Sequence, residues 1–213
     1  MSPGQTAKHS SWAYAEEHAD GDPIFQAARL RAADLGCTEV SPGTAAALSV
    51  LAASCGARAL AEIGTGVGIS GTALLRGAAK HAVLTSIDTN PDHIAAAAET
   101  FRADGIPASR TRLITGDAAQ VLPRLNSAGY DLVLIDADPQ DVGSYAADGL
   151  RLIRSGGLLI INDALDGDRV PKPAVRSEST QAMREAERSL REDERLTTAL
   201  FPTGSGLLVA VKA

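Results

Sequence analysis

Five short apolar runs recur along the middle of this 213-residue chain, and each is followed by a stretch with helical periodicity. The runs are rich in Leu, Ile, Val or Thr and are almost continuously apolar, which is typical of strands buried on both faces. Strand–helix units in series predict a parallel, doubly wound α/β sheet. The runs are 59–63, 82–88, 110–115, 130–136 and 157–162, with helices expected at 69–79, 91–104, 117–126 and 141–154.

The end of the chain follows a different pattern. A helix with a charged face is expected at 176–193, and two more apolar runs follow at 196–201 and 206–212. Only Pro202-Thr203-Gly204-Ser205 joins these two runs, and a link this short forces neighbouring strands to be antiparallel. The sequence therefore predicts a mostly parallel sheet that ends in an antiparallel hairpin.

The N-terminal quarter is predicted to be helical, with helices at 11–35 and 44–54 after a frayed segment at 1–10. Gly36 and the Ser41-Pro42-Gly43 breaker separate the two helices. The length suits a single domain with one core. We expect one domain over 1–213, with a helical cap at 1–55 and a cofactor-binding core at 56–213.

Composition excludes several classes of partner. The net charge of −6 and the 3% aromatic content give no basis for nucleic-acid binding, and no run has transmembrane length or resembles a signal core. The expected location is cytoplasmic, without a membrane partner. Cys37 and Cys55 lack metal-ligand or redox spacing and are interpreted as idle thiols. The four histidines show no ligand spacing and are expected at the surface: His9, His18, His81 and His93.

The stretch ALAEIGTGVGISGTALL (residues 59–75) is a glycine turn between an expected strand and an expected helix. It lacks the lysine of a phosphate-binding P-loop. Residues 66–71 match the dinucleotide pattern G-x-G-x-x-G, and Asp88 lies about twenty residues further on. The turn alone leaves a dinucleotide and another adenosyl cofactor as alternatives.

Motifs along the rest of the chain resemble those of the class I S-adenosylmethionine-dependent methyltransferases, and more narrowly the catechol and caffeoyl-CoA O-methyltransferase-like family. The similarity spans residues 38–213. It rests on Glu62-x-Gly64-Thr65-Gly66-x-Gly68-x-Ser70, Ser86-Ile87-Asp88, Gly116-Asp117-Ala118, Leu134-Ile135-Asp136-Ala137-Asp138 and Gly204-Ser205-Gly206-Leu207-Leu208. The resemblance implies a Rossmann-like, seven-stranded sheet, S-adenosylmethionine as cofactor, and a homodimer. It also implies that the N-terminal helices and the loop at 164–176 cover the acceptor.

The resemblance also assigns roles to residues. Asp88, an acceptor-only group, is expected to bind both ribose hydroxyls, although it could instead cap the helix that begins near Pro91. The resemblance places Ala118 beside the adenine, and Ser70 with the backbone of Val40 at the cofactor's carboxylate. The predicted cofactor-binding residues are Val40, Glu62, Gly64, Thr65, Gly66, Gly68, Ser70, Asp88, Asp117, Ala118 and Asp136.

Asp136 is the predicted catalytic residue, because in the resembling family this aspartate faces the sulfonium and also holds a divalent metal. The family's other metal ligands are an aspartate followed by an asparagine, whereas this chain has Asn162-Asp163. Both residues still offer the hard oxygen that magnesium takes, so the metal ligands are predicted as Asp136, Asn162 and Asp163. The alternative for this pair is turn formation before Asp166-Gly167-Asp168, which would leave a metal-free site that acts by alignment or takes an acidic acceptor.

A second departure from the family is Pro139, which stands where the family carries a lysine that acts as general base. The neighbouring Asp138 and Asp141 are interpreted as helix caps. The predicted function is an S-adenosylmethionine-dependent O-methyltransferase for a small hydroxylated, aromatic acceptor. Two alternatives stay open: an NAD-dependent oxidoreductase, which would lack an obvious catalytic Tyr-Lys pair, and a non-catalytic S-adenosylmethionine-binding module.

Overall fold

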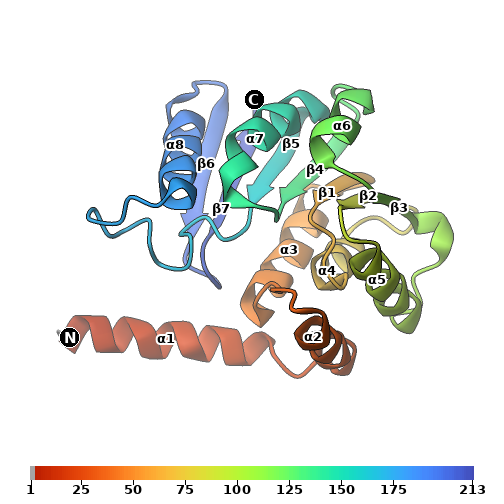
Figure 1. The fold of residues 1–213 in the computed structure, drawn as a ribbon, viewed down its shortest axis with the longest axis horizontal. Coiled ribbons are helices and arrows are strands. Elements are labelled where there is room, and N and C mark those ends of the chain that lie inside the picture. Colours follow the sequence, from red (N-terminus) through yellow and green to blue (C-terminus); the bar gives the residue numbers. More distant parts are fainter. Residues whose placement is uncertain (1–2) are drawn as a thin grey trace.

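The computed structural model describes residues 3–213 and contains the expected mostly parallel, seven-stranded sheet (Figure 1). The strand order is β3-β2-β1-β4-β5-β7-β6, in which β7 runs antiparallel to both β5 and β6. The direction of winding reverses between β1 and β4, and ligands of such sheets bind at this switch point. The strands are β1 Ala59–Ile63, β2 Val83–Asp88, β3 Thr111–Thr115, β4 Tyr130–Ile135, β5 Ile153–Ile161, β6 Leu196–Phe201 and β7 Leu207–Lys212.

Helices cover both faces of the sheet (Figure 1). They are α1 Pro3–Ala19, α2 Pro23–Leu35, α3 Pro42–Ser54, α4 Ile69–Gly77, α5 Pro91–Ala103, α6 Ala118–Val121, α7 Val142–Leu152 and α8 Glu178–Glu192. Three single 3₁₀ turns complete the described helical structure, at Ala108–Arg110, Leu122–Arg124 and Pro139–Asp141.

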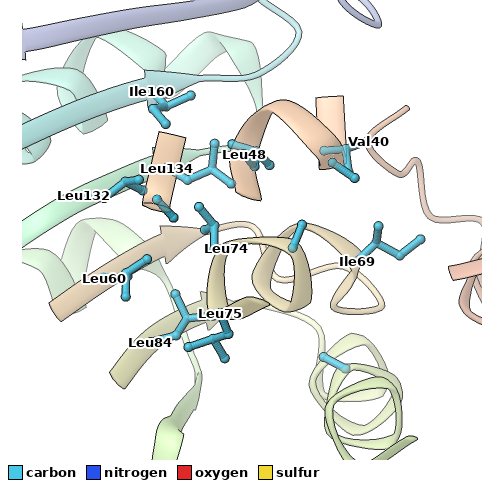
Figure 2. Packing of buried hydrophobic residues seen from close by; sticks show 14 of the residues in the cluster. Val40, Leu48, Leu60, Ile69, Leu74, Leu75, Leu84, Leu132, Leu134 and Ile160 are labelled. Atoms are coloured by element: carbon cyan, nitrogen blue, oxygen red, sulfur yellow. The ribbon is translucent and has the colours of Figure 1, made fainter. Parts of the chain in front are cut away.

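Alternate residues of the central strands enter two separate hydrophobic clusters. Leu60 packs with Leu132 and Leu134 beneath α3 and α4 (Figure 2), whereas Ala61 and Ile63 pack on the opposite face with α7 and α8. Successive strand residues point to opposite faces, and here both faces are buried. This is why the strands are almost continuously apolar in sequence, and the predicted fold class is confirmed.

The N-terminal region differs from the prediction. The single helix expected at 11–35 is wrong, because Asp20-Gly21-Asp22 divides it into α1 and α2. Gly21 has φ of +104°, and the Asp22 side chain accepts hydrogen bonds from the amides of Ile24 and Phe25, which fixes a new helix start. The prediction of a frayed segment at 1–10 is wrong for residues 3–10, which are helical, and residues 1 and 2 lie outside the described part.

Two further boundaries differ for local reasons. The helix expected at 117–126 breaks into α6 and a 3₁₀ turn, because Pro123 has no amide hydrogen to continue the helix. Strand β5 begins at Ile153, inside the helix expected at 141–154, and its pairing with β4 is irregular between Tyr130 and Leu132.

Helices α2 and α3 are packed into the same core as the sheet. Phe25, Ala28 and Leu48 belong to the cluster that contains Leu60 of β1. The division at residue 55 into a cap and a cofactor-binding core stays a prediction. Of the helices in the described part, none is long and apolar enough to span a membrane.

The carboxylate of Glu16 connects helix α1 to two neighbouring segments. Glu16 accepts hydrogen bonds from the amides of Gly43 (2.7 Å) and Gly204 (2.8 Å) and from Thr203 Oγ1 (3.1 Å). Burial opposes ionisation of this group, but the hydrogen bonds outweigh it and lower the pKa of Glu16. A charged Glu16 therefore ties α1 to the start of α3 and to the β6–β7 loop.

Candidate active site

A cavity of about 450 Å³ lies at the carboxyl ends of β1, β2 and β4, at the switch point of the sheet. This volume is in the range of small-molecule sites. Eight of the eleven predicted cofactor-binding residues line it: Gly64, Thr65, Gly66, Ser70, Asp88, Asp117, Ala118 and Asp136. Val40, Glu62 and Gly68 lie outside this lining.

The glycine turn after β1 passes too close to its neighbours to carry side chains. At Gly64, φ is +88° and an added Cβ would lie 1.8 Å from the carbonyl oxygen of Asp136. At Gly66, φ is +50° and a Cβ would lie 2.6 Å from Glu39 Oε1. The backbone of Asp136 excludes a β-carbon at Gly64, and the positive φ favours glycine at Gly66, so the turn brings bare backbone to the cavity.

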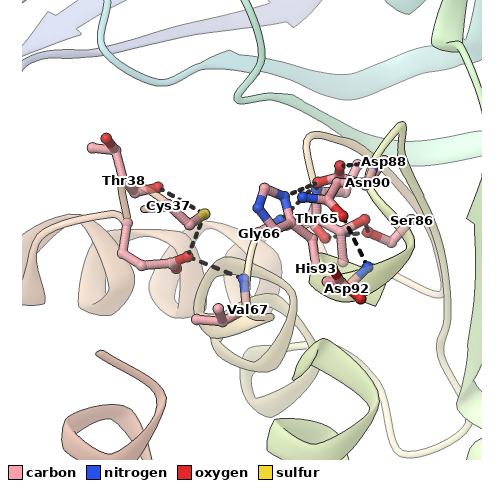
Figure 3. Close-up of polar contacts among 12 residues, drawn as sticks. Cys37, Thr38, Thr65, Gly66, Val67, Ser86, Asp88, Asn90, Asp92 and His93 are labelled. Carbon is pink, nitrogen blue, oxygen red and sulfur yellow. Dashed lines mark hydrogen bonds and ion pairs between the residues drawn. The ribbon is translucent and has the colours of Figure 1, made fainter. Parts of the chain in front are cut away.

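Asp88 ends β2 and organises this turn (Figure 3). Its Oδ2 accepts the amides of Thr65 (3.0 Å) and Gly66 (3.1 Å), and its Oδ1 accepts the amide of Asn90 (2.9 Å). The N-cap of α5 is Asn90, whose side chain accepts from the Asp92 amide. The alternative in which Asp88 caps α5 is therefore wrong.

His93 also lies at this end of the cavity, on the first turn of α5. Its Nδ1 is 3.3 Å from Asp88 Oδ2, and its side chain is only 19% exposed. The surface prediction for His93 is wrong, whereas His9, His18 and His81 are exposed. Periodicity could not identify His93, because its partner Asp88 is on another element.

Glu62 is fully buried beneath the turn. Its Oε1 accepts the hydroxyl of Ser70 at 2.6 Å and its Oε2 accepts the hydroxyl of Ser86 at 2.6 Å. Burial raises the pKa of Glu62 to about 8, against the lowering effect of the two hydroxyls. Glu62 therefore contacts the cavity through Ser70.

Asp136 follows β4 and faces the same space. Its Oδ1 accepts the side-chain amide of Asn162 at 2.9 Å. Burial raises the pKa of Asp136 to about 6; the Asn162 hydrogen bond lowers it, and the nearby Glu39 raises it. A positively charged ligand group beside Asp136 would reverse this shift and favour the carboxylate.

The three predicted metal ligands are not assembled into one site. Asp163 has φ of +52°, and its Oδ1 accepts the amide of Gly167 at 2.9 Å, which closes the following turn. Asn162 presents its amide donor to Asp136, where a cation would require the amide oxygen. No group of three or more His, Cys, Asp or Glu in the described part of the chain could hold a metal ion. These residues, as placed, do not fit a magnesium site.

The two aspartates on either side of Pro139 and Gln140 have different roles. Asp138 caps the 3₁₀ turn by accepting the amide of Gln140 at 3.0 Å, as predicted. Asp141 precedes α7 but makes no side-chain capping bond, and it lines the cavity instead. The interpretation of Asp141 as a capping side chain is wrong.

Glu39 is a cavity residue that sequence reasoning missed. Its Oε1 accepts the Val67 amide at 3.0 Å, in the turn that precedes α4, and the Cys37 thiol donates to the same oxygen at 3.3 Å. Burial raises the pKa of Glu39. Burial and the charge of Glu39 raise the pKa of Cys37 to about 12, so this thiol stays protonated and unreactive, in keeping with an idle cysteine.

The cavity is strongly acidic. Among the described residues that line it there is no Lys or Arg. One side chain that can carry positive charge, His93, is among the lining residues. Six carboxyl side chains line the cavity: Glu39, Asp88, Asp117, Asp136, Asp138 and Asp141. Such a lining favours a ligand with positive charge and disfavours phosphates.

Comparison with known proteins assigns the family. A family model described as O-methyltransferase matches residues 24–213. The chain belongs to this O-methyltransferase family. A protein of Mycobacterium tuberculosis named "Probable O-methyltransferase" is 48% identical over 213 residues, covering 99% of this chain and 95% of that protein. The prediction that the chain is a methyltransferase is confirmed.

Solved structures share the fold of this chain. A Corynebacterium glutamicum protein has a TM-score of 0.89 and 30% identity, with 97% of each chain covered. The O-methyltransferase TomG of Streptomyces achromogenes, solved in complex with SAM, has a TM-score of 0.85 and 24% identity, with 96% of each chain covered. The likeness to TomG shows a shared fold. The methyltransferase thus has the sheet, including the antiparallel hairpin, of its structural relatives.

Proposed function

We propose that this O-methyltransferase transfers a methyl group from S-adenosylmethionine to a hydroxyl of a small aromatic acceptor. One observation carries the choice of cofactor. The side chain of Glu39, which precedes α3, reaches the turn before α4, where its carboxyl group accepts the Val67 amide at 3.0 Å. In dinucleotide-binding folds the pyrophosphate occupies the helix start after the glycine turn. Here the chain places its own anion there, which disfavours the NAD-dependent alternative.

The acidic lining supports the same cofactor. S-adenosylmethionine carries a sulfonium and an ammonium group, and six carboxyl side chains face the cavity. The bare backbone at Gly64 and Gly66 gives the ligand close access to the turn. The complex of TomG with SAM shows that a protein of this fold accommodates the cofactor.

We assign the parts of the cofactor to residues as follows. Asp136, whose carboxyl is held by Asn162, binds the ammonium group. Ser70, set in place by Glu62, and the backbone at Val40 bind the carboxylate. Asp88 binds the ribose, and Asp117 with Ala118 borders the adenine. The buried Gly68 acts through the shape of the turn.

The bound cofactor supplies a methyl group on a positively charged sulfur, which is already a good leaving group. The protein's tasks are then to align the acceptor oxygen and to favour its anionic form. Pro139 has no titratable group, and the predicted metal ligands do not converge. We therefore propose that alignment and the acidity of the acceptor hydroxyl carry the reaction, and no step is assigned to a metal.

The acceptor is inferred to lack a phosphate or carboxylate near its reacting hydroxyl. Asp136, Asp138 and Asp141 line the cavity, and a fixed negative charge on the acceptor would be repelled by them. The reacting oxygen itself would face the positively charged sulfur of the cofactor, which offsets its negative charge when it ionises. A neutral or cationic phenol meets no such penalty.

The proposal includes a homodimer. Helix α1 leaves Trp12 44% exposed and Tyr14 72% exposed, and a partner subunit could cover these side chains. Light scattering during size-exclusion chromatography tests this part separately, since a monomer at micromolar concentration contradicts it.

The whole proposal is tested with purified protein, S-adenosylmethionine and a panel of phenols that differ in acidity. We expect methyl ethers and S-adenosylhomocysteine as products, with faster turnover for the more acidic phenols at a fixed pH. Tight S-adenosylhomocysteine binding without turnover on any acceptor would favour the non-catalytic module. Tight NAD binding in its place would overturn the cofactor assignment.

A further inference from the structure

The carboxylate of Asp88 is largely occupied by the protein itself. Its Oδ2 accepts the amides of Thr65 and Gly66 and lies 3.3 Å from His93 Nδ1, and its Oδ1 accepts the amide of Asn90. A carboxylate oxygen offers about two acceptor positions. The two amides alone occupy both positions of Oδ2, and His93 shares this oxygen at a longer distance, so Oδ2 keeps no position for a ligand. Oδ1 keeps about one. A ribose presents two neighbouring hydroxyl groups.

His93 is placed to supply the missing acceptor. The side chain lines the cavity, and Nδ1 faces Asp88 beside the amide of Gly66 (Figure 3). A neutral imidazole that donates from Nδ1 carries its free lone pair on Nε2, on the other side of the ring. Asp88 is an acceptor and therefore selects this tautomer.

The backbone around His93 fixes the position of the ring. Asn90 caps α5 by accepting the Asp92 amide at 2.9 Å, and Pro91 opens the helix. Asp88 in turn holds the Asn90 amide. The ring and the carboxylate thus belong to one hydrogen-bonded corner between β2 and α5.

We propose that His93 is a second ribose-binding residue, with Nε2 accepting one hydroxyl of the cofactor's ribose while Asp88 Oδ1 accepts the other. This inference rests on the proposed S-adenosylmethionine-dependent function. It makes the Asp88–His93 pair responsible for distinguishing ribose from deoxyribose.

The test is calorimetric binding of S-adenosylhomocysteine and of its 2′-deoxy and 3′-deoxy analogues to the wild-type protein and to His93→Ala. We expect the wild-type protein to lose about five- to tenfold in affinity for each analogue. His93→Ala should bind S-adenosylhomocysteine about five- to tenfold more weakly and should show no further loss with one of the two analogues. The variant should bind the other analogue more weakly than S-adenosylhomocysteine, by the same factor as the wild-type protein does.

Two more variants separate contact from support. His93→Gln keeps a distal acceptor and should restore discrimination against the same analogue. His81→Ala removes an exposed histidine just before β2 and should leave all three affinities unchanged. Melting temperatures of the free proteins check that each variant folds.

Several outcomes would overturn the inference. His93→Ala could discriminate against both analogues as the wild type does, which would make His93 a support for Asp88 without a ribose contact. Unchanged affinity of His93→Ala for S-adenosylhomocysteine would also overturn it and leave the proposed function intact. Failure of the wild-type protein to bind S-adenosylhomocysteine would overturn the proposed function, and the inference with it.

Discussion

Asn162 donates its side-chain amide to Oδ1 of Asp136 across 2.9 Å, at the ends of two neighbouring strands. The register of β4 and β5 pairs Ile135 with Ile161, so the next residue of each strand is brought to the same edge. Neighbouring side chains along a strand point to opposite sides. The order Asn162-Asp163 therefore places the amide, and not the second carboxylate, beside Asp136.

The first prediction is that activity does not depend on a divalent metal. Because Asp163 Oδ1 closes the turn to Gly167, Asp163→Asn should keep turnover within about threefold of wild type, since Asn retains an acceptor and tolerates positive φ. Asp136→Ala should lose at least about tenfold in cofactor affinity, the cost of a charge-assisted hydrogen bond. Turnover should survive exhaustive treatment with EDTA; its abolition by EDTA and recovery with magnesium would contradict the prediction.

The second prediction concerns the pH dependence of cofactor binding. Asp136 has a pKa of about 6 in the free protein, and binding an ammonium group requires its ionised form. Affinity for S-adenosylhomocysteine should be level above about pH 7 and fall progressively as the pH drops through 6, because a proton must then be displaced. Titration calorimetry between pH 5 and 8 measures this.

The matched variants for this prediction are Asp136→Asn and Asp163→Asn. Asp136→Asn should bind S-adenosylhomocysteine weakly at every pH, without the fall in affinity below pH 7. Asp163→Asn should keep the pH dependence of the wild type. A wild-type affinity that is constant down to pH 5 would show that Asp136 does not bind the ammonium group.

The sheet could be predicted because its signal is local. The central parallel strands are buried on both faces, so apolarity is continuous from Leu132 to Ile135 and then stops at Asp136. The break between α1 and α2 was missed because it depends on a short stop, Asp20-Gly21-Asp22, inside a longer helical pattern. Boundaries set by single caps are weaker signals than periodicity.

The motif residues of the site could also be placed from sequence, since most of them follow strands at one edge. Glu39 and His93 could not, because each acquires its role from a partner on another element, Val67 and Asp88 respectively. For Asp163 the sequence leaves both metal binding and turn formation open, and the positive φ of Asp163 with its hydrogen bond from the Gly167 amide decides for the turn.

The third prediction is that Asp166 is essential for the stability of the segment after β5. It is fully buried, receives hydrogen bonds from Ser179 and Thr180 at the start of α8, and pairs with Arg169. Asp166→Ala would leave the buried Thr180 hydroxyl without its acceptor, at a cost of about 2–3 kcal/mol. For a chain of this size, the melting temperature should fall by roughly 4–12 °C.

Asp168→Ala is the control for this effect, because it changes an exposed aspartate of the same turn. Asp166 and Asp168 both have positive φ (+50° and +62°), so both alanine variants carry a similar backbone cost. Asp168→Ala should therefore lower the melting temperature by roughly 4–12 °C less than Asp166→Ala does, because only Asp166 also loses buried hydrogen bonds. Equal shifts for the two variants would mean that the buried hydrogen bonds of Asp166 contribute little.

The fourth prediction is that the free protein loses stability as the pH rises through the range in which Glu62 ionises. Burial penalises the charged form and raises the pKa of Glu62 to about 8 in the folded chain, from 4.5 for an unperturbed glutamate carboxyl. Between these two values the unfolded chain binds fewer protons than the folded one, so the free energy of unfolding decreases with rising pH. Glu62→Gln removes the ionisation and keeps one acceptor oxygen for one of the two hydroxyls, Ser70 or Ser86, while its NH2 group donates to the other hydroxyl. Urea unfolding at pH 5.5, 7 and 8.5 measures this. The free energy of unfolding should decrease less with rising pH for Glu62→Gln than for the wild type.

The control is Glu192→Gln, an exposed substitution at the end of α8, which should show the same decrease as the wild type. Parallel decreases for Glu62→Gln and the wild type would locate the pH dependence in groups other than Glu62.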